Sequence, residues 1–165
     1  MVEGPPRHDS EMASALQRLF EAQAVFRRFA PRATVSAHML FVFLALRTSH
    51  RGQLDLPNQV AMAEAIGITQ SNVNQLLASM TVKGRAKTSS SASSGDEGYG
   101  LIETNDWIQG RRFTPYVLTE KGRACVTEMV TALLGHEPSE EFRPHDMNSL
   151  FNLLLVQAGR KGRNT

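Results

Sequence analysis

The feature that most constrains this chain is a glycine break between two helix-forming segments, in the stretch AEAIGITQSNVNQLLASM at residues 63–80. Gly67 permits a tight turn that a side chain would obstruct, and Thr69 has the hydroxyl that caps a new helix. Five of the six residues after Thr69 carry an amide or hydroxyl side chain, which a helix built only for packing does not require. The stretch therefore predicts two short helices that meet at a sharp corner.

The second of these helices divides into two faces. Its apolar residues recur at positions i, i+3, i+4 and i+7, which lie on one side of a helix, and the polar residues fall on the other side. We expect one face to pack against the core and the other to be presented to a partner. The packed face comprises Val73, Leu76, Leu77 and Met80, and the opposite face comprises Ser71, Asn74, Gln75 and Ala78.

Apolar periodicity predicts further helices before this corner. Residues 9–29 carry an apolar stripe at steps of three, four or seven, and Pro31 ends that helix. Thr34 can cap a second helix that runs to about Arg47, whose apolar density predicts a central core helix buried on most sides. A short helix starting at Pro57 then forms the first half of the corner.

The region after the corner predicts a loop and a hairpin. Residues 85–100, RAKTSSSASSGDEGYG, are rich in serine and glycine and lack apolar anchors, so we expect an inserted flexible loop. Residues 101–104 and 113–118 have the composition of two strands around a turn-prone segment, and Pro115 confines the second strand to a sheet edge. Together these strands predict a β-hairpin.

Two helices are expected after the hairpin. Thr119 can cap one that ends at Gly135, with its apolar residues clustered on one side. A last helix starts at Asp146, and its apolar run through Leu155 is too hydrophobic for a lone surface helix. This segment therefore requires a partner surface.

Composition sets the outer bounds of fold and function. A chain of 165 residues fits a single domain, 1–165, and 41% hydrophobic with 21% charged residues is ordinary for a globular protein. A net charge of +2 permits nucleic-acid binding without demanding it. The one cysteine, Cys125, predicts a small buried hydrophobe, and the lack of long apolar runs predicts no membrane contact and a cytoplasmic location.

Motifs for catalysis or metal binding are not found in the sequence. The five histidines share no ligand spacing with one another or with Cys125. The sequence also contains no phosphate loop, nucleophile elbow or dinucleotide fingerprint. We therefore expect no enzyme activity and no cofactor.

A helix, a glycine turn, a capped helix and a hairpin form the arrangement in which the second helix enters the major groove of double-stranded DNA. Amides offer a donor beside an acceptor, which suits adenine. Basic residues beside this helix and near the hairpin tip are expected to follow phosphates or enter the minor groove. The candidate DNA-binding residues are Thr69, Gln70, Ser71, Asn72, Asn74, Gln75, Lys83, Arg85, Lys87, Arg111 and Arg112.

From Leu54 to Leu134 the chain resembles the MarR-type winged helix-turn-helix regulators. ITQSNVNQLLASMTVKG is similar to their recognition helix, and LIETNDWIQGRRFTPYVLTEKGR, with its closing LTEKGR, is similar to their wing and the helix after it. The resemblance implies a mainly α fold with a winged helix-turn-helix at 54–118, a β-hairpin wing, and N- and C-terminal dimerisation helices at 9–47 and 119–158. It also implies a homodimer that controls transcription, usually as a repressor, on a pseudo-palindromic operator.

Three features set the chain apart from this family pattern. The loop at 85–100 separates segments that the family usually joins directly. Gln75 stands where the family often has arginine, which favours adenine over guanine as the base that is read. Cys125 lies in a late helix, whereas redox-sensing relatives carry an N-terminal cysteine. The family often binds a small-molecule effector, but the sequence identifies none here.

Other functions fit the same pattern. A winged-helix module could bind a protein, with the serine-rich loop as its docking site and the polar helix face as ordinary surface. A DNA-binding accessory protein of replication or mobile-element maintenance could carry the same residues as a regulator.

Overall fold

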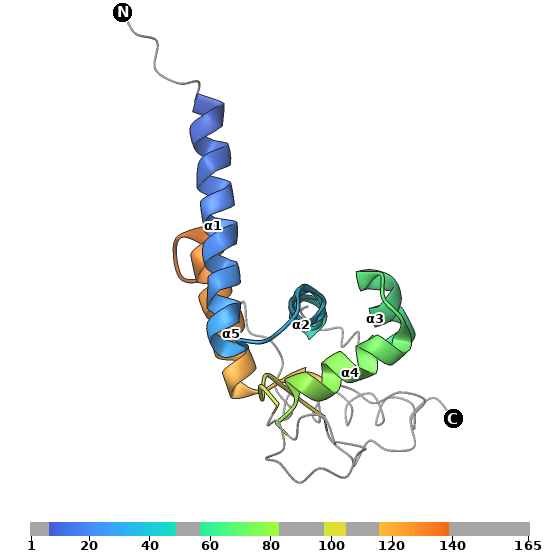
Figure 1. Cartoon of the computed structure of the whole chain (residues 1–165). Coiled ribbons are helices and arrows are strands. Elements are labelled where there is room, and N and C mark those ends of the chain that lie inside the picture. Colours follow the sequence, from blue (N-terminus) through green and yellow to red (C-terminus); the bar gives the residue numbers. More distant parts are fainter. Residues whose placement is uncertain (1–6, 49–56, 83–97, 105–115, 139–165) are drawn as a thin grey trace, which may run out of the picture.

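The structure is a computed structural model, and it describes residues 7–48, 57–82, 98–104 and 116–138. These residues form a mainly α fold of five helices with a small two-stranded antiparallel sheet (Figure 1). None of the described helices is long and apolar enough to cross a membrane. The elements are α1 (Arg7–Phe29), α2 (Val35–Thr48), α3 (Gln59–Ile66), α4 (Gln70–Met80), β1 (Ile102–Glu103), β2 (Val117–Leu118) and α5 (Glu120–Leu134).

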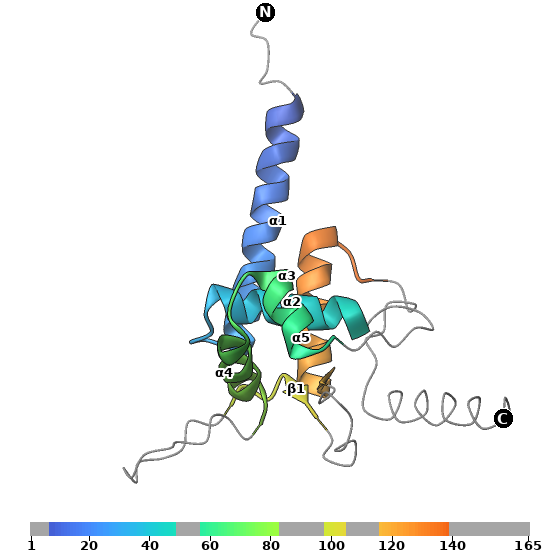
Figure 2. The same cartoon turned by 90° about the vertical axis from the view of Figure 1, so that its right-hand side faces the viewer.

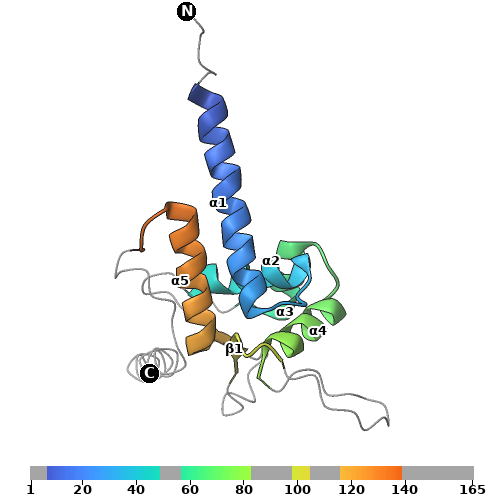
Figure 3. The same ribbon diagram turned by 60° about the vertical axis from the view of Figure 1, so that its left-hand side comes forward.

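The long helix α1 dominates the shape of the molecule. Its C-terminal half packs along α5, and its N-terminal half projects beyond the other elements (Figures 1 and 3). Helix α2 lies between the lower part of α1 and the pair α3 and α4 (Figures 1 and 2). The small sheet lies where α4 ends and α5 begins (Figure 3).

Capping residues confirm most of the predicted helix ends. The hydroxyls of Thr34, Thr69 and Thr119 each accept a hydrogen bond from the backbone N–H three residues further on, at 3.2, 3.3 and 3.0 Å. Gly67 and Gly135 end α3 and α5 in the left-handed backbone conformation. These signals act within one helical turn, which is why the sequence locates them well.

The start of α3 differs from the prediction. The cap is Asn58, whose side-chain oxygen accepts a hydrogen bond from the N–H of Ala61 at 2.8 Å. Pro57 precedes the cap and is buried, so it does not open the helix. An asparagine side chain can satisfy a free N–H group of the first turn, which proline cannot do.

The hairpin strands are shorter than predicted within the described residues. β1 and β2 pair antiparallel, with Ile102 opposite Leu118 and Glu103 opposite Val117. The predicted strand at 101–104 thus contributes two ladder residues. Residues 113–115 and the expected tip lie outside the described residues.

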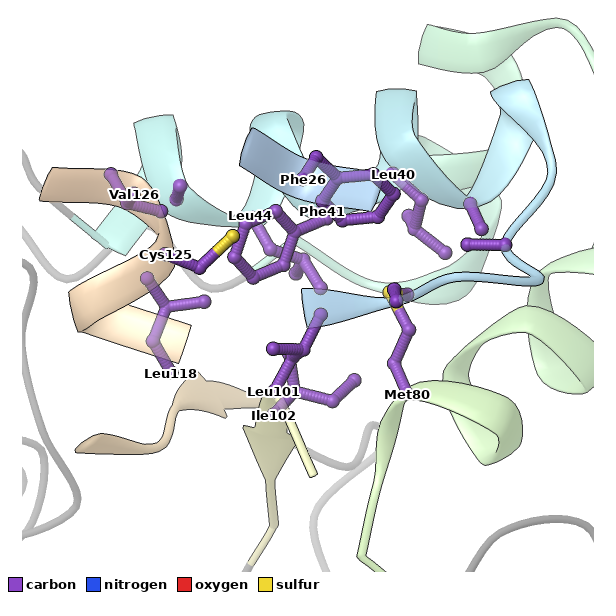
Figure 4. Close-up of a cluster of buried hydrophobic side chains, with 14 of the residues drawn as sticks. Phe26, Leu40, Phe41, Leu44, Met80, Leu101, Ile102, Leu118, Cys125 and Val126 are labelled. Carbon is purple, nitrogen blue, oxygen red and sulfur yellow. The ribbon is translucent and has the colours of Figure 1, made fainter. Parts of the chain in front are cut away.

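The hydrophobic core is centred on α2 (Figure 4). Leu40, Phe41 and Leu44 are at most 1% exposed, and the ring of Phe26 from α1 lies 5.4 Å from that of Phe41. Full burial of side chains of this size stabilises the fold by roughly 1.5–3 kcal/mol each. The other elements close the core with Met80, Leu101, Ile102, Leu118, Cys125 and Val126.

Helix α2 is not buried on most sides, contrary to the expectation from its apolar density. One face supplies the core, but four residues of the outer face are 43% to 65% exposed. Both faces of α2 are apolar, so composition alone does not identify the face that meets the core. The four exposed residues are Val35, Met39, Val42 and Leu46.

Candidate nucleic-acid interface

The corner between α3 and α4 is closed by local hydrogen bonds. The N–H groups of Gly67 and Ile68 both bond the carbonyl oxygen of Ala63. Gly67 has a φ angle of 70°, which residues with a side chain seldom adopt, although no atom lies within 4 Å of the place a Cβ would occupy. Glycine is therefore required here by backbone conformation, and not by obstruction of a side chain as the sequence suggested.

One face of α4 is fixed in the core, as predicted. Val73, Leu77 and Met80 are at most 1% exposed, and Leu76 is half-buried beside them. The helix begins at this cap, because the N–H of Val73 donates a 3.0 Å hydrogen bond to the carbonyl oxygen of Thr69. The direction of the opposite face of α4 is thereby fixed as well.

The opposite face of α4 is polar and uncharged. No charged residue occurs between Ile68 and Val82. Four polar side chains of this face are exposed, and among the described residues none of them makes a side-chain hydrogen bond. Ala78, which was also expected on this face, is half-buried. The four residues are Ser71, Asn72, Asn74 and Gln75.

Gln70 differs from these four residues. Its side-chain Nε2 donates a 3.3 Å hydrogen bond to Oε1 of Gln59 in the first turn of α3. The pair spans the two helices of the corner, so Gln70 helps to hold their relative position. Sequence reasoning missed Gln59, because its partner lies eleven residues away in another helix.

The base of the hairpin is tied to the C-terminal end of α4. The N–H of Tyr99 bonds the carbonyl oxygen of Ser79 at 2.9 Å, and the N–H of Leu101 bonds that of Met80 at 2.8 Å. Tyr99 is also half-buried against the core. The loop expected at 85–100 is therefore anchored from residue 98 onward, while residues 85–97 lie outside the described part of the chain.

The first turn of α5 fits closely against this base. The hydroxyl of Thr119 donates to the carbonyl oxygen of Gly100 at 2.6 Å, while it accepts the capping bond from Gly122. A Cβ on Gly122 would lie 2.0 Å from the carbonyl oxygen of Leu101. Glycine is thus the only residue that lets α5 approach the hairpin base at this distance.

Two basic residues of the same turn complete the attachment. Nζ of Lys121 donates to the carbonyl oxygen of Tyr99 at 2.8 Å, and Nη1 of Arg123 donates to that of Leu118 at 2.9 Å. The segment LTEKGR therefore holds both sides of the hairpin base through its side chains and its glycine. This geometry gives a physical reason for the spacing of the motif.

The predicted basic contacts are outside the part of the chain that the structure describes. They belong to residues 83–97 and 105–115, so their position relative to α4 is not described. Of the predicted DNA-binding residues, the structure therefore brings together those from Thr69 to Gln75 only. The basic residues are Lys83, Arg85, Lys87, Arg111 and Arg112.

Cys125 is a buried core residue, as the sequence predicted. Burial, with a smaller contribution from Glu128, raises the pKa of its thiol to about 12. The thiol also lies 3.8 Å from the sulfur of Met129. A thiol in this environment is protonated and inert near neutral pH, which disfavours a redox role.

His38 lies at the junction of α1 and α2. Its ring centroid is 4.6 Å from that of Phe26, and its Nε2 is buried without a hydrogen bond to any described residue. Burial lowers the pKa of His38, so the ring is neutral near pH 7. Among the described residues, no group of three His, Cys, Asp or Glu side chains is placed to hold a metal ion.

Comparisons of this chain with known protein families, with curated proteins and with solved structures found no match. The resemblance to MarR-type regulators therefore rests on the residues quoted above.

Proposed function

We propose that this protein is a sequence-specific transcriptional regulator that binds double-stranded DNA through a winged helix-turn-helix, with α4 as its recognition helix. The observation that carries the proposal is the exposed polar face of α4. Its packed side is fixed by three buried residues, while its outer side exposes amides and hydroxyls that form no side-chain hydrogen bond within the described residues. A helix held in the core with an exposed polar face is what direct reading of base edges requires.

The side chains of α4 fit adenine-containing sites best. Asn74 and Gln75 each carry a donor and an acceptor that match adenine N7 and N6, and Ser71 can bond either a base or a phosphate. No charge lies on this face, so attraction to the phosphates is assigned to the basic residues at 83–87 and 111–112. The proposal thus assigns base recognition to α4 and phosphate binding to the basic residues.

The same proposal includes a homodimer. Residues 11–20 of α1 are all exposed, and Met12, Leu16, Leu19 and Phe20 form an apolar stripe that is 49% to 70% exposed. A second copy paired through this stripe would place two α4 helices on a pseudo-palindromic operator. Repression is the outcome that the MarR-like pattern favours.

A second candidate is a winged-helix module that binds a protein. The absence of positive charge on the exposed face of α4 favours it, because most DNA-binding surfaces are basic. A DNA-binding accessory protein in replication or mobile-element maintenance would use the same DNA chemistry as the regulator.

A gel-shift titration of the full-length protein separates these functions. The DNA upstream of its own coding sequence is compared with shuffled DNA of equal length, since such regulators often control their own genes. We expect at least 1,000-fold tighter binding to the upstream DNA, with affinity that falls as salt rises. Equal affinity for both DNAs would contradict the regulator, and no binding by folded protein would favour the protein-binding module.

A further inference from the structure

The outer face of α2 is the most apolar exposed surface among the described helices. Its four exposed residues are spaced by four, three and four positions, so they lie in one line along the helix. Every side chain that is exposed between residues 35 and 47 belongs to this line, so neither charge nor polar group interrupts it. We call Val35, Met39, Val42 and Leu46 the α2 outer stripe.

The stripe differs from the other exposed helix faces. The exposed half of α1 mixes its apolar residues with Glu11, Arg18 and Glu21, and the exposed side of α4 is polar. A continuous line of exposed apolar side chains is a surface that soluble proteins usually cover with protein. The partly buried Arg47 flanks the end of this line, where its guanidinium lies over the ring of Phe43. The stripe runs for about 16 Å from Val35 to Leu46 at 1.5 Å per residue.

The sequence contains one segment that matches this surface. Residues 147–158, MNSLFNLLLVQA, carry no charge, and Met147, Leu150, Phe151 and Leu154 recur at helical spacing. As a helix this segment would also be about 16 Å long. An uncharged amphipathic segment and an uncharged apolar stripe of equal length are complementary in both chemistry and size.

The same chain is long enough to make this contact. Eight residues, 139–146, separate the last described residue, Pro138, from the segment, and they can span up to about 27 Å. A helix with its side chains is about 10–12 Å wide. Helices α5 and α2 contribute side chains to the same hydrophobic core (Figure 4).

We propose that residues 147–158 of the same chain dock as a helix on the α2 outer stripe. The contact does not depend on DNA binding, and it differs from pairing of two copies through α1. It also departs from the dimerising role that the family resemblance implies for the end of the segment 119–158. It would place the C-terminal segment on the helix that supports both α4 and β2.

Thiol labelling of the full chain tests this proposal, because Cys125 is the single native cysteine and is buried. Met39→Cys places a thiol in the stripe, and Ser71→Cys places a matched control on the exposed face of α4. We expect a maleimide to label Met39→Cys at least tenfold more slowly than Ser71→Cys. Adding Leu150→Asp with Leu154→Asp should abolish this protection and leave the control rate and the circular dichroism of the described fold unchanged.

Equal labelling rates at both positions in the otherwise native chain would overturn the proposal, and so would protection that survives the two aspartates. The labelling rate of Met39→Cys is then measured over a wide range of protein concentrations to identify the donor. Protection that does not change with concentration supports docking within one chain. Protection that is lost on dilution would overturn it, because the segment would then come from a second copy.

Discussion

The two ends of the molecule are built in opposite ways. At one end, α4, the hairpin base and the first turn of α5 hold one another through buried side chains and through hydrogen bonds from Thr119, Lys121 and Arg123. At the other end, the N-terminal half of α1 projects with every residue from 11 to 20 exposed (Figure 1). The first end is supported from within the chain, and the second has no such support among the described residues.

This difference indicates what each end contacts. A polar surface that is already rigid can meet DNA without first being ordered, so little conformational entropy is lost on binding. A lone helix with an apolar stripe is marginally stable in water and gains most from contact with another protein. This difference supports the proposal that the α4 end contacts DNA and the α1 end contacts a second copy.

The largest loss of stability is expected when a side chain is introduced at Gly122, where α5 meets the hairpin base. In Gly122→Ala the new Cβ meets the backbone oxygen of Leu101, so α5 or the hairpin base must move. We expect a loss of unfolding free energy on the order of 3 kcal/mol, measured by urea denaturation. The exposed Thr127→Ala on the same helix is the control and should change stability by less than about 0.5 kcal/mol. Similar stability of both variants would show that the close approach is not required.

The projecting end is tested by a charge in its apolar stripe. Phe20 is 70% exposed, so Phe20→Glu should leave the fold of one chain intact and weaken self-association about 30-fold or more, near 2 kcal/mol. Sedimentation equilibrium measures the change, and Ser14→Glu, which adds the same charge to the exposed half of α1 away from the stripe, is the control. A native chain that is monomeric at micromolar concentration would contradict the proposed homodimer.

The polar face of α4 is tested by Gln75→Ala. We expect a cost of about 1–3 kcal/mol on the operator with relaxed preference at one base pair, and little change on random DNA. Fluorescence anisotropy with both DNAs measures this, and the exposed amide of Gln17 on α1 provides the control variant Gln17→Ala. Equal losses on both DNAs would make Gln75 an attachment residue, and no loss would make it ordinary surface.

The junction between the two ends should respond weakly to pH through His38. Its pKa in the folded state is lowered from 6.5 by burial, so the stability it contributes is fully present above about pH 6.5 and decreases as the pH falls. His38→Phe should therefore lose less unfolding free energy than the native chain between about pH 7.5 and about pH 5.5. Parallel pH profiles of the two proteins would show that His38 does not contribute this dependence.

The sequence predicted the helix ends well and the contacts between elements poorly. Thr34, Thr69 and Thr119 act on N–H groups within one turn, so their role is visible locally. Gly122 and Leu101 are far apart in sequence, and the need for glycine there appears only when α5 meets the hairpin base. The packing of Tyr99 against the core was not predicted either, because the serine-rich composition around it predicted a loop.

The part of the candidate site that depends on a single helix was predictable from the sequence. The division of α4 into a buried and a polar face follows from the spacing of its apolar residues, and the structure confirms it for Val73, Leu77 and Met80. The bond between Gln59 and Gln70 was not predictable, since it depends on the angle between α3 and α4. The outer face of α2 was missed because an apolar helix does not reveal from its sequence how much of it the chain itself covers.

Selection of bound sequences from a random double-stranded DNA library tests the central claim most directly. The full-length protein should enrich an inverted repeat whose half-site centres lie about one helical turn apart, near 10 base pairs, with A·T pairs at the positions read by α4. That result would assign DNA reading to α4 and two-fold pairing to the dimer in one experiment. Failure of folded protein to enrich any sequence would contradict the regulator, and enrichment of a single unrepeated site would contradict the dimer.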